Sequence, residues 1–369
     1  MTENPNMYAD MYAIHSIPAA NMNSDDNGMQ KKVSVGGALR TRVSSQAWKR
    51  AIRDRFDERA FRTKKAVELL VRKMMDIDAG ITEAEASEKA VKLLKAEEVS
   101  LTNDNTTKAL IMLSPKQIDN AARYALSCDS KKYSKKDVKE ILKKDNSLDL
   151  ALFGRMVAKD PALKVDAAVQ FAHAFSTHRI EPEYDYFTAL DDLQNKDEQG
   201  ASHLDHTEYN ASTFYRYANV NVNELIHNLD RNKEAGIAGT VEFIRNFVLA
   251  MPTGMQNRHA NKTLPSYLMV SLRTDTPVNL AVAFEKPVII HNNEYDYKYG
   301  YTDKSIERLE NEFNSTLKMV DNPTATFVLN LESDDTKVKG AVTAENLNDL
   351  LQKVSETLTK AVQDEDNND

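Results

Sequence analysis

The stretch of sequence that decides the fold is RTRVSSQAWKRAIRDRF, residues 40–56. Ser44 is a favourable helix N-cap, and the residues after it predict a helix from Ser45 to about Lys73. Side chains at i, i+3, i+4 and i+7 share one face of a helix. One such stripe is polar and consists of Gln46, Lys49, Arg50 and Arg53. The opposite side is apolar and consists of Trp48, Ile52 and Phe56. The helix should therefore pack on a sheet and present the polar stripe outward.

The polar stripe has the chemistry of an anion site. Three cations within two turns repel one another unless an anion or an acidic partner offsets them. A phosphate backbone fits, because guanidinium groups pair with phosphate in a bidentate manner and an ammonium supplies a point charge. Ser44 and Ser45 add hydroxyl and N–H groups at the helix start, and Arg40 and Arg42 precede it. A solvated basic face balanced by acids of the same chain is the alternative.

The net charge of the whole chain argues against an anion site. Its 369 residues carry a formal net charge of −8, which taken alone argues against a nucleic-acid partner. The charge is unevenly placed, however. Residues 31–65 hold twelve Lys or Arg against three acids, a net charge of +9. Residues 181–208 hold nine acids against one Lys, a net charge of −8. A polyanion site concentrated on one face is therefore compatible with the acidic total.

Composition excludes several classes of protein. Hydrophobic residues make up 41% and charged residues 28%, as in a globular rather than a disordered protein. Cys128 is the single cysteine, which excludes an intramolecular disulfide and a cysteine-based zinc site. The N-terminal residues lack the pattern of an export signal, and no apolar run approaches the roughly 20 residues of a membrane span. We expect a cytoplasmic protein without a membrane partner.

Strand patterns lie at both ends of the chain, and helical patterns lie between them. The first strand is expected at 8–17 and a loop at 21–37, followed by helices to about residue 180. These helices include 82–98, 114–126, 135–144 and a core-facing one at 165–175. Later strands are expected at 212–222, 266–272, 279–284 and 324–331, and later helices at 223–249, 303–319 and 343–361. The pattern predicts an α+β sheet domain that carries a large helical insertion.

Histidines and nucleotide-binding motifs give little support for chemistry. His173 and His178 are five residues apart on the expected core-facing helix, which is not the spacing of a zinc-binding pair. His203 and His206 are only two candidate ligands in a loop expected to be exposed. The sequence contains no GxxxxGK[ST], GxGxxG or GxSxG motif. We therefore expect no cofactor, no bound metal and no catalytic residue.

Residues 23–53 resemble the signature of a known family. Its pattern is an N-x-N-R-D-D loop, a Lys, G-G-x-x-R-x-R-V-S-S-Q and then W-K-R-A-x-R. This sequence matches it at Asn23, Asp25, Asp26, Lys31, Gly36, Gly37, Arg40, Arg42, Ser44, Ser45, Gln46, Trp48, Lys49, Arg50, Ala51 and Arg53. Further similarity lies at 152–158, 165–194, 203–225 and 257–263. The family is the CasC-type backbone subunit of the type I-E CRISPR Cascade complex, in the seventh Cas family. Ser24 departs from the pattern by replacing an Arg.

The resemblance implies an α+β fold shaped like a right hand. Its palm is RNA-recognition-like (ferredoxin-like), with an inserted helical fingers domain and a β-hairpin thumb. The palm would comprise residues 1–60, with an RNA-binding helix at 45–60, and residues 223–369. The fingers would be residues 61–190, and the thumb hairpin would be residues 191–222.

The resemblance also implies a function. Members polymerise along a CRISPR RNA, typically in six copies, and leave the guide bases free to pair with target DNA. The partners would be the guide RNA, target DNA through guide pairing, further copies of the chain, and the large, small and two RNA-end-binding Cascade subunits. The implied guide contacts are Lys31, Gln46, Lys49, Arg50 and Arg53, with Arg42 and Ser44 nearby. Met156 would wedge beside displaced bases, with core packing as the alternative, and His203 would lie in the thumb tip that straddles the RNA.

An RNA-cleaving enzyme is the rival interpretation. Backbone subunits of type III complexes cut RNA with a loop aspartate, so Asp25 or Asp26 could serve in metal-dependent cleavage. Adjacent acids in a loop rich in Asn and Gly more often form turns or ion pairs, and type I backbones are understood as non-cleaving scaffolds. We expect a binding protein and not an enzyme. A protein-interaction scaffold without RNA affinity is the other alternative.

Overall fold

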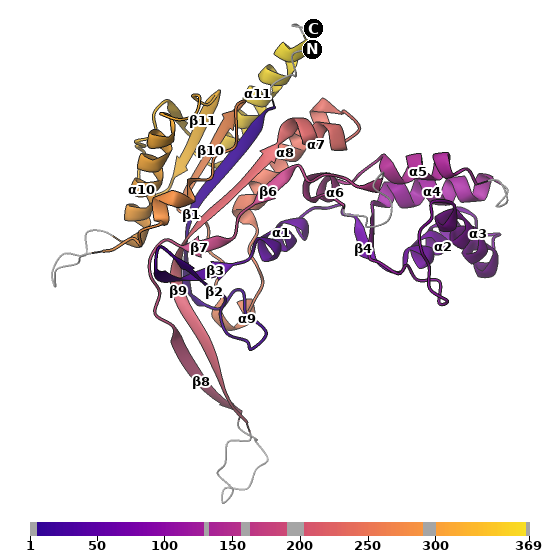
Figure 1. Ribbon diagram of the computed structural model, residues 1–369, viewed down its shortest axis with the longest axis horizontal. Coiled ribbons are helices and arrows are strands. Elements are labelled where there is room, and N and C mark those ends of the chain that lie inside the picture. The colour runs from indigo at the N-terminus through magenta and orange to yellow at the C-terminus, as the bar shows by residue number, and fades with distance from the viewer. Residues whose placement is uncertain (1–5, 129–132, 156–162, 190–202, 291–299, 367–369) are drawn as a thin grey trace, which may run out of the picture. The chain divides into compact units, whose positions relative to one another are not determined.

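The computed structural model describes residues 6–128, 133–155, 163–189, 203–290 and 300–366. The chain divides into two compact units, and Figure 1 labels most of their elements. Unit 1 comprises residues 1–54, 171–219 and 243–360, and unit 2 comprises residues 55–170, 220–242 and 361–369. Within the described ranges, no helix is both long and apolar enough to cross a membrane.

Strands and helices are interspersed along the described ranges. The strands are β1 (Tyr8–Ala20), β2 (Lys32–Val35), β3 (Ala38–Val43), β4 (Phe61–Thr63), β5 (Ile111–Leu113), β6 (Val169–Phe171), β7 (Ala174–Ser176), β8 (Glu183–Ala189), β9 (His203–Asn221), β10 (Tyr267–Arg273), β11 (Ala325–Asn330) and β12 (Ala341–Thr343). The helices are α1 (Ser45–Arg53), α2 (Ala66–Ile77), α3 (Glu83–Ala96), α4 (Pro115–Ser127), α5 (Lys135–Lys143), α6 (Leu148–Phe153), α7 (Val222–Asn228), α8 (Lys233–Leu249), α9 (Gln256–His259), the 3₁₀ helix η3 (Leu280–Phe284), α10 (Tyr301–Thr316) and α11 (Leu347–Asp366).

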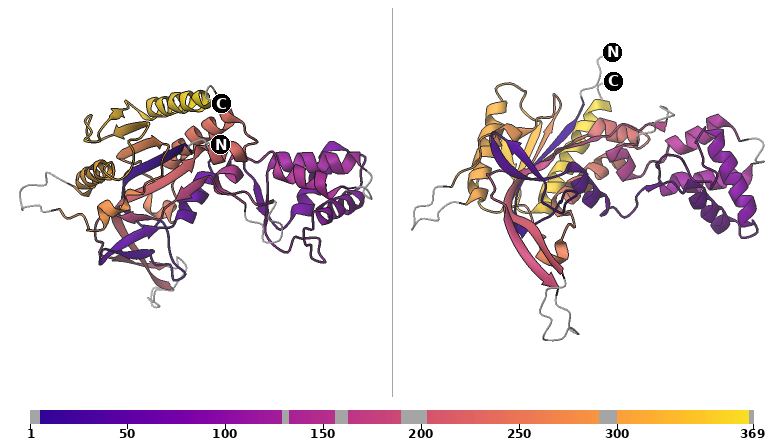
Figure 2. Two further views of the ribbon diagram at one scale, coloured as in Figure 1. Left: turned by 45° about the horizontal axis from the view of Figure 1, so that its top comes forward. Right: turned by 60° about the horizontal axis from the view of Figure 1, so that its bottom comes forward.

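A large mixed sheet forms the centre of unit 1. Its strand order is β12-β11-β10-β1-β9-β7-β3-β2, and β8 pairs with β9 outside this order. Strand β1 pairs antiparallel with β10, from Tyr8 opposite Arg273 to Ile14 opposite Tyr267. Strand β12 runs parallel to β11. Figures 1 and 2 show β1, β10 and β11 side by side. The expected α+β class is confirmed.

The two faces of this sheet bury different side chains, because successive residues of a strand point to opposite faces. Tyr12 of β1 and Tyr215 of β9 are buried in a cluster with Leu309 of α10. Phe214, the neighbour of Tyr215, belongs to a second cluster with Trp48 of α1. Burial of these apolar side chains is the main force that holds α1 and α10 on the sheet.

The expected loop at 21–37 is wrong at its end, where residues 32–35 form β2. Strand β2 pairs antiparallel with β3, with Val35 opposite Ala38, so Gly36 and Gly37 form a two-residue hairpin turn. Both glycines have positive φ angles, 57° and 73°, as the favoured two-residue hairpin turn requires. A Cβ atom at Gly36 would lie 1.8 Å from the carbonyl oxygen of Glu285. Only glycine fits there.

Two expected helices are wrong for long-range reasons. The helix expected at 45–73 is interrupted by β4, so that it forms α1 and α2. Strand β4 pairs with β5, and the N–H of Ala60 donates to Asp149, 2.9 Å away. The core-facing helix expected at 165–175 is instead β6 and β7, because β7 pairs with β3 and β9 on its two sides. Partners distant in sequence satisfy these backbone groups, and local periodicity does not reveal them.

Two smaller expectations are also corrected. The strand expected at 279–284 is the 3₁₀ helix η3, capped by Asn279, whose Oδ1 accepts the N–H of Ala281 at 3.1 Å. The helix expected at 223–249 is divided into α7 and α8. Asp230 and Arg231 between them have φ angles of 58° and 63°, which no helix contains. The other expected helices and the strands at 8–17, 266–272 and 324–331 are confirmed to within a few residues.

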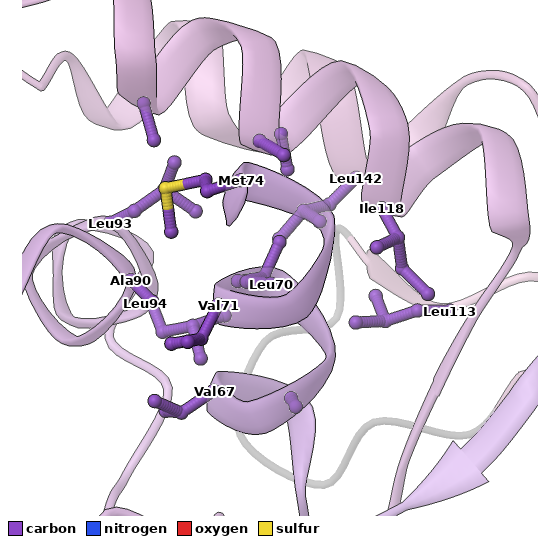
Figure 3. Close-up of a cluster of buried hydrophobic side chains, with 14 of the residues drawn as sticks. Val67, Leu70, Val71, Met74, Ala90, Leu93, Leu94, Leu113, Ile118 and Leu142 are labelled. Carbon is purple, nitrogen blue, oxygen red and sulfur yellow. The ribbon is translucent and has the colours of Figure 1, made fainter. Parts of the chain in front are cut away.

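Unit 2 has its own hydrophobic core, in which α2, α3, α4 and α5 pack together. Figure 3 shows Met74 and Leu70 of α2 pointing toward Leu93 and Leu142 of the neighbouring helices. Capping boxes begin two of the helices, at Thr82–Glu85 and at Ser114–Gln117. The core draws on residues from Ala66 to Leu163, so this part of unit 2 is built from one continuous segment.

Strands β8 and β9 form a two-stranded ribbon. Their pairing runs from Glu183 opposite Tyr209 to Ala189 opposite His203. Figure 1 shows this ribbon extending beyond the remaining strands of the sheet of unit 1. Residues 190–202 lie outside the described ranges. The identification of palm, fingers and thumb stays a prediction.

Candidate nucleic-acid interface

Helix α1 begins and ends where its local sequence dictates. The side chain of Ser44 accepts the N–H of Ala47 at 3.2 Å, as an N-cap does. The first turn contains no acid, and the last turn contains Arg50 and Arg53, which interact favourably with the C-terminal end of the helix dipole. Trp48 is fully buried, as predicted, whereas the outward side of the helix carries the polar stripe.

The buried cation Arg216 packs against the ring of Trp48. The guanidinium carbon of Arg216, on β9, lies 3.8 Å from the centre of the Trp48 ring and 4.5 Å from that of Phe247. Arg216 donates to the carbonyl of Phe247, and its Nη1 lies 3.1 Å from Nδ1 of His15. Burial lowers the pKa of Arg216 to about 9, so that the side chain stays charged at neutral pH. Stacking on two aromatic faces partly replaces the water that this cation has lost.

His15 completes this arrangement as a neutral ring. Its Nδ1 faces Arg216, and its Nε2 lies 2.9 Å from the hydroxyl of Thr263. Burial first, and then the charge of Arg216, lower the pKa of His15 to about 3. The hydroxyl of Thr263 in turn donates to the carbonyl of Ser16, 2.9 Å away. The support beneath α1 is therefore rigid and fully internal.

The predicted polar stripe lies on the outward side of α1. Gln46 and Arg50 are exposed, the side chain of Arg50 to 85%, and Lys49 and Arg53 are half-buried. Burial lowers the pKa of Lys49. Nε of Arg50 forms an ion pair with the exposed Asp54 at 3.8 Å, and a pair between two exposed side chains contributes little to stability. The stripe therefore presents cations outward.

Lys31 and Arg42 lie beside the start of α1. The N–H of Arg42 donates to the carbonyl of Lys31 at 2.8 Å, which brings the two cations together across neighbouring strands. Nη1 of Arg42 lies 3.5 Å from Nδ1 of His173, and the N–H of Ser45 donates to the same nitrogen at 2.9 Å. Two of the predicted residues and the first turn of α1 thus meet at one point.

His173 is the residue that the sequence failed to indicate. It was expected on a core-facing helix, but it is exposed in the short segment between β6 and β7. The pairing of β7 with β3, in which Val43 is opposite Ala174, brings residue 173 to the start of α1. That pairing joins residues more than 130 positions apart in the sequence, and no local pattern reports it.

Two residues expected near an anion have internal roles. Ser44 is 8% exposed: its hydroxyl caps α1, and its N–H donates to Oδ1 of Asn23 at 2.9 Å. Arg40 is fully buried and donates to the carbonyls of Ser176 and Phe284, at 2.9 and 3.1 Å. Arg40 therefore contributes to the +9 segment of the sequence but presents no group to the outside.

The loop that precedes β2 is built on Asp25. Its Oδ1 accepts the N–H groups of Asn27 and Met29, at 2.9 and 3.0 Å, and so closes a tight turn. Asp26 is exposed. In the part of the chain that the structure describes, no group of three or more His, Cys, Asp and Glu could hold a metal ion.

This loop is fixed to the ribbon. The side-chain amide of Asn21 donates to the carbonyls of Gly28 and Glu208, at 3.1 and 3.0 Å. Lys32 of β2 forms an ion pair with the buried carboxylate of Glu208 on β9. These contacts join the loop, the β2–β3 hairpin and β9 around Lys31.

The two remaining predicted RNA contacts, Met156 and His203, lie in or next to segments outside the described ranges. Met156 lies outside the described residues. His203 is the first residue of β9, but its side chain lies outside the described part. On β8, the side chains of Tyr184 and Tyr186 are 48% and 71% exposed and share one face of the ribbon.

The chain matches known proteins along almost its whole length. Residues 9–355 match the family described as CT1975-like protein. The structure is similar to a chain of a "CRISPR RNA-guided surveillance complex, pre-nicking", with 28% sequence identity and a TM-score of 0.80, over 96% of this chain and 100% of that one. It is also similar to a chain of a "CRISPR RNA-guided surveillance complex", with 25% identity and a TM-score of 0.70, over 95% and 99%. No curated protein matches the chain.

Proposed function

Because the chain belongs to the CT1975-like protein family, we propose that it is a guide-RNA-binding subunit of a CRISPR surveillance complex. Two chains of RNA-guided surveillance complexes resemble it in full, with TM-scores of 0.80 and 0.70. The observation that carries the proposal is the meeting of Lys31, Arg42 and the start of α1 around His173, next to the outward stripe of α1.

Such a surface fits an RNA backbone better than it fits bases. Guanidinium and ammonium groups recognise phosphate through charge and carry no sequence information. The side chains involved are Lys31, Arg42, Gln46, Lys49, Arg50 and Arg53. In an RNA-guided complex the protein holds the backbone while base pairing reads the sequence. The surface leaves the base edges free for target DNA.

The finer assignments belong to the same proposal. The subunit would be of the CasC type of a type I-E complex, assemble along the guide in about six copies and contact the large, small and RNA-end-binding subunits. Residues 1–60 and 223–369 would form the RNA-recognition-like palm, residues 61–190 the helical fingers, and residues 191–222 the thumb hairpin. Met156 would wedge beside displaced bases, and His203 would lie in the thumb tip that straddles the RNA.

We place the protein among scaffolds and not among RNA-cleaving enzymes. The carboxylate of Asp25, in the loop, accepts hydrogen bonds from two backbone N–H groups, as an aspartate that stabilises a turn does. A general base or metal ligand needs its lone pairs directed at the reacting group. Asp26, the second acid of this loop, is exposed.

The test is to purify the chain from cells that carry a CRISPR locus and to sequence the RNA that copurifies. The expected result is RNA with the repeat and spacer sequences of that locus, protected at a regular interval. The proposal would be contradicted if the purified chain contained no nucleic acid and did not bind a synthetic repeat–spacer RNA at low salt. That result would favour a protein-interaction scaffold.

A further inference from the structure

His173 lies where the predicted cations and helix α1 meet. Its Nδ1 accepts the backbone N–H of Ser45 at 2.9 Å, and Nη1 of Arg42 lies 3.5 Å from the same atom. Two donors therefore point at Nδ1. The ring itself is exposed, so that its other nitrogen, Nε2, is on the solvent side of this contact.

The contact fixes the tautomer of the ring. A backbone N–H can only donate, so Nδ1 must offer a lone pair. In a neutral imidazole the proton is then on Nε2, which becomes a donor. Neither a hydrogen bond nor an ion pair occupies Nε2 in the described part of the chain. His173 thus presents an N–H group to the outside.

The surroundings keep the ring neutral. Burial first, and then the charges of Arg42 and Lys31, lower the pKa of His173. Protonation on Nδ1 would also break the bond from Ser45 and leave the first N–H of α1 without its acceptor. The ring is therefore a neutral donor between two cations, rather than a third cation.

We propose that His173 binds a phosphate group of the guide RNA through its Nε2–H, together with the side chains of Lys31 and Arg42. A backbone phosphate has two non-bridging oxygens, which accept from an imidazole N–H as well as from cations. The inference rests on the proposed function and adds to it a residue and a mode of contact. One side of the ring holds the helix, and the other side holds the ligand.

Three substitutions separate these two roles. His173→Asn keeps an oxygen near Nδ1 for the N–H of Ser45 but does not reach the position of Nε2. His173→Gln places an amide N–H near the position that Nε2 has in the parent chain, but it has no acceptor near the position of Nδ1. His173→Phe keeps the ring shape and loses both. Binding of the full chain, freed of copurified RNA, to a fluorescent repeat–spacer RNA is measured by anisotropy, and thermal stability is measured alongside.

The expected order of affinities follows from the Nε2 donor. His173→Asn and His173→Phe should bind RNA about tenfold more weakly than the parent chain, the size of one hydrogen bond to a charged group. His173→Gln should stay within about threefold of the parent. If His173→Asn binds RNA with the affinity of the parent chain, His173 only caps the helix and the inference is overturned. The inference is also overturned if His173→Gln binds RNA as weakly as His173→Phe does.

Salt dependence distinguishes a neutral donor at position 173 from a charged ring. Each neutralised cation on single-stranded RNA should flatten the slope of log affinity against log salt by about 0.7. Arg42→Gln should show this change, whereas His173→Phe should bind more weakly with an unchanged slope, because a neutral donor releases no counterion. A flattened slope in His173→Phe would show a charged ring and overturn the inference.

Labelled histidine gives a direct view of the tautomer. In ¹⁵N spectra of the RNA-free chain, His173 should show a protonated Nε2 and an unprotonated Nδ1, and added RNA should shift the Nε2 signal. The opposite tautomer, or an unmoved Nε2 in a chain that binds RNA, would refute the phosphate contact alone. A parent chain with no RNA affinity at all would refute the proposed function as well.

Discussion

The guanidinium of Arg216 stacks on the indole of Trp48, 3.8 Å from the ring centre, directly beneath the helix that carries the cationic stripe. Both side chains are fully buried. The outward face of α1 is therefore set by an inward contact between a β9 cation and an aromatic ring. A planar guanidinium can make this stack, whereas an ammonium cannot.

Arg216→Lys should accordingly be the harmful substitution at this site. It keeps a buried charge while it loses the stack and the fork of donors, and we expect the free energy of unfolding to fall by about 3 kcal/mol. Arg216→Met removes the charge at similar volume and should cost about 1 kcal/mol. Urea unfolding followed by the fluorescence of Trp48, the single tryptophan, measures both. Equal losses would show that the charge and its stack are irrelevant.

The stripe itself is tested by removing its charge. Lys49→Gln, Arg50→Gln and Arg53→Gln together should weaken RNA binding by at least tenfold in 0.1 M salt and flatten the salt slope by about 2. A matched control with the same change of charge is Lys318→Gln, Lys339→Gln and Lys360→Gln, three exposed lysines elsewhere in unit 1. If the control loses as much affinity as the stripe variant, only net charge matters and α1 is not the site.

Two buried groups give unit 1 opposing pH dependences. Burial raises the pKa of Asp10 to about 6, so its contribution to stability is present at low pH and is lost as the pH rises through 6. The pKa of His15 is lowered to about 3, so its contribution is present above about pH 6.5 and is lost as the pH falls. Between pH 4 and 6 the two effects largely cancel.

Asp10→Asn should uncover the effect of His15. Relative to the parent chain, the variant should lose about 2–3 kcal/mol of unfolding free energy between pH 6 and 4, at about 1.4 kcal/mol for each pH unit. Urea titrations followed by Trp48 fluorescence at each pH measure this loss. The double variant Asp10→Asn, His15→Gln should restore the flat profile of the parent, and a single variant with that same flat profile would contradict the account.

The loop aspartates should be dispensable for any chemistry. Asp25→Ala removes the acceptor of two N–H groups and should loosen the loop, whereas Asp26→Ala should change little. Neither should abolish an activity, because we expect the parent chain to leave RNA uncut in Mg²⁺ or Mn²⁺. Gel analysis of a labelled target RNA checks this. Metal-dependent cutting by the parent that disappears in either variant would establish the enzyme interpretation.

The sequence predicted the parts of the site that are local. Ser44 and the spacing of Trp48 and Ile52 define α1 and its buried side, because capping and helical periodicity act within one or two turns. The same reasoning gave the outward stripe. It also placed β1 and β10 correctly, since both are short apolar runs bounded by turns.

What the sequence could not show depends on pairing between distant strands. Arg40 counts as a surface cation in any local reading, but hydrogen bonds to Ser176 and Phe284 place it inside. His173 was assigned to a helix because its apolar neighbours repeat with helical spacing, whereas strand pairing with β3 and β9 decides the segment. Sheet contacts of this kind override local periodicity, and they brought His173 to the site.

The order of the strands also has a consequence for synthesis on the ribosome. Strand β1 pairs with β10, and Tyr8 and Arg273 are partners 265 positions apart. At 5–20 residues per second, β1 waits roughly 13–50 s for β10 to be made, whereas β9, its neighbour on the other side, is made earlier. The helical core between Ala66 and Leu163 is complete much earlier and can form first. The newly made chain therefore carries an apolar strand with an open edge until β10 is made, and such an edge is a site of aggregation that a chaperone would protect.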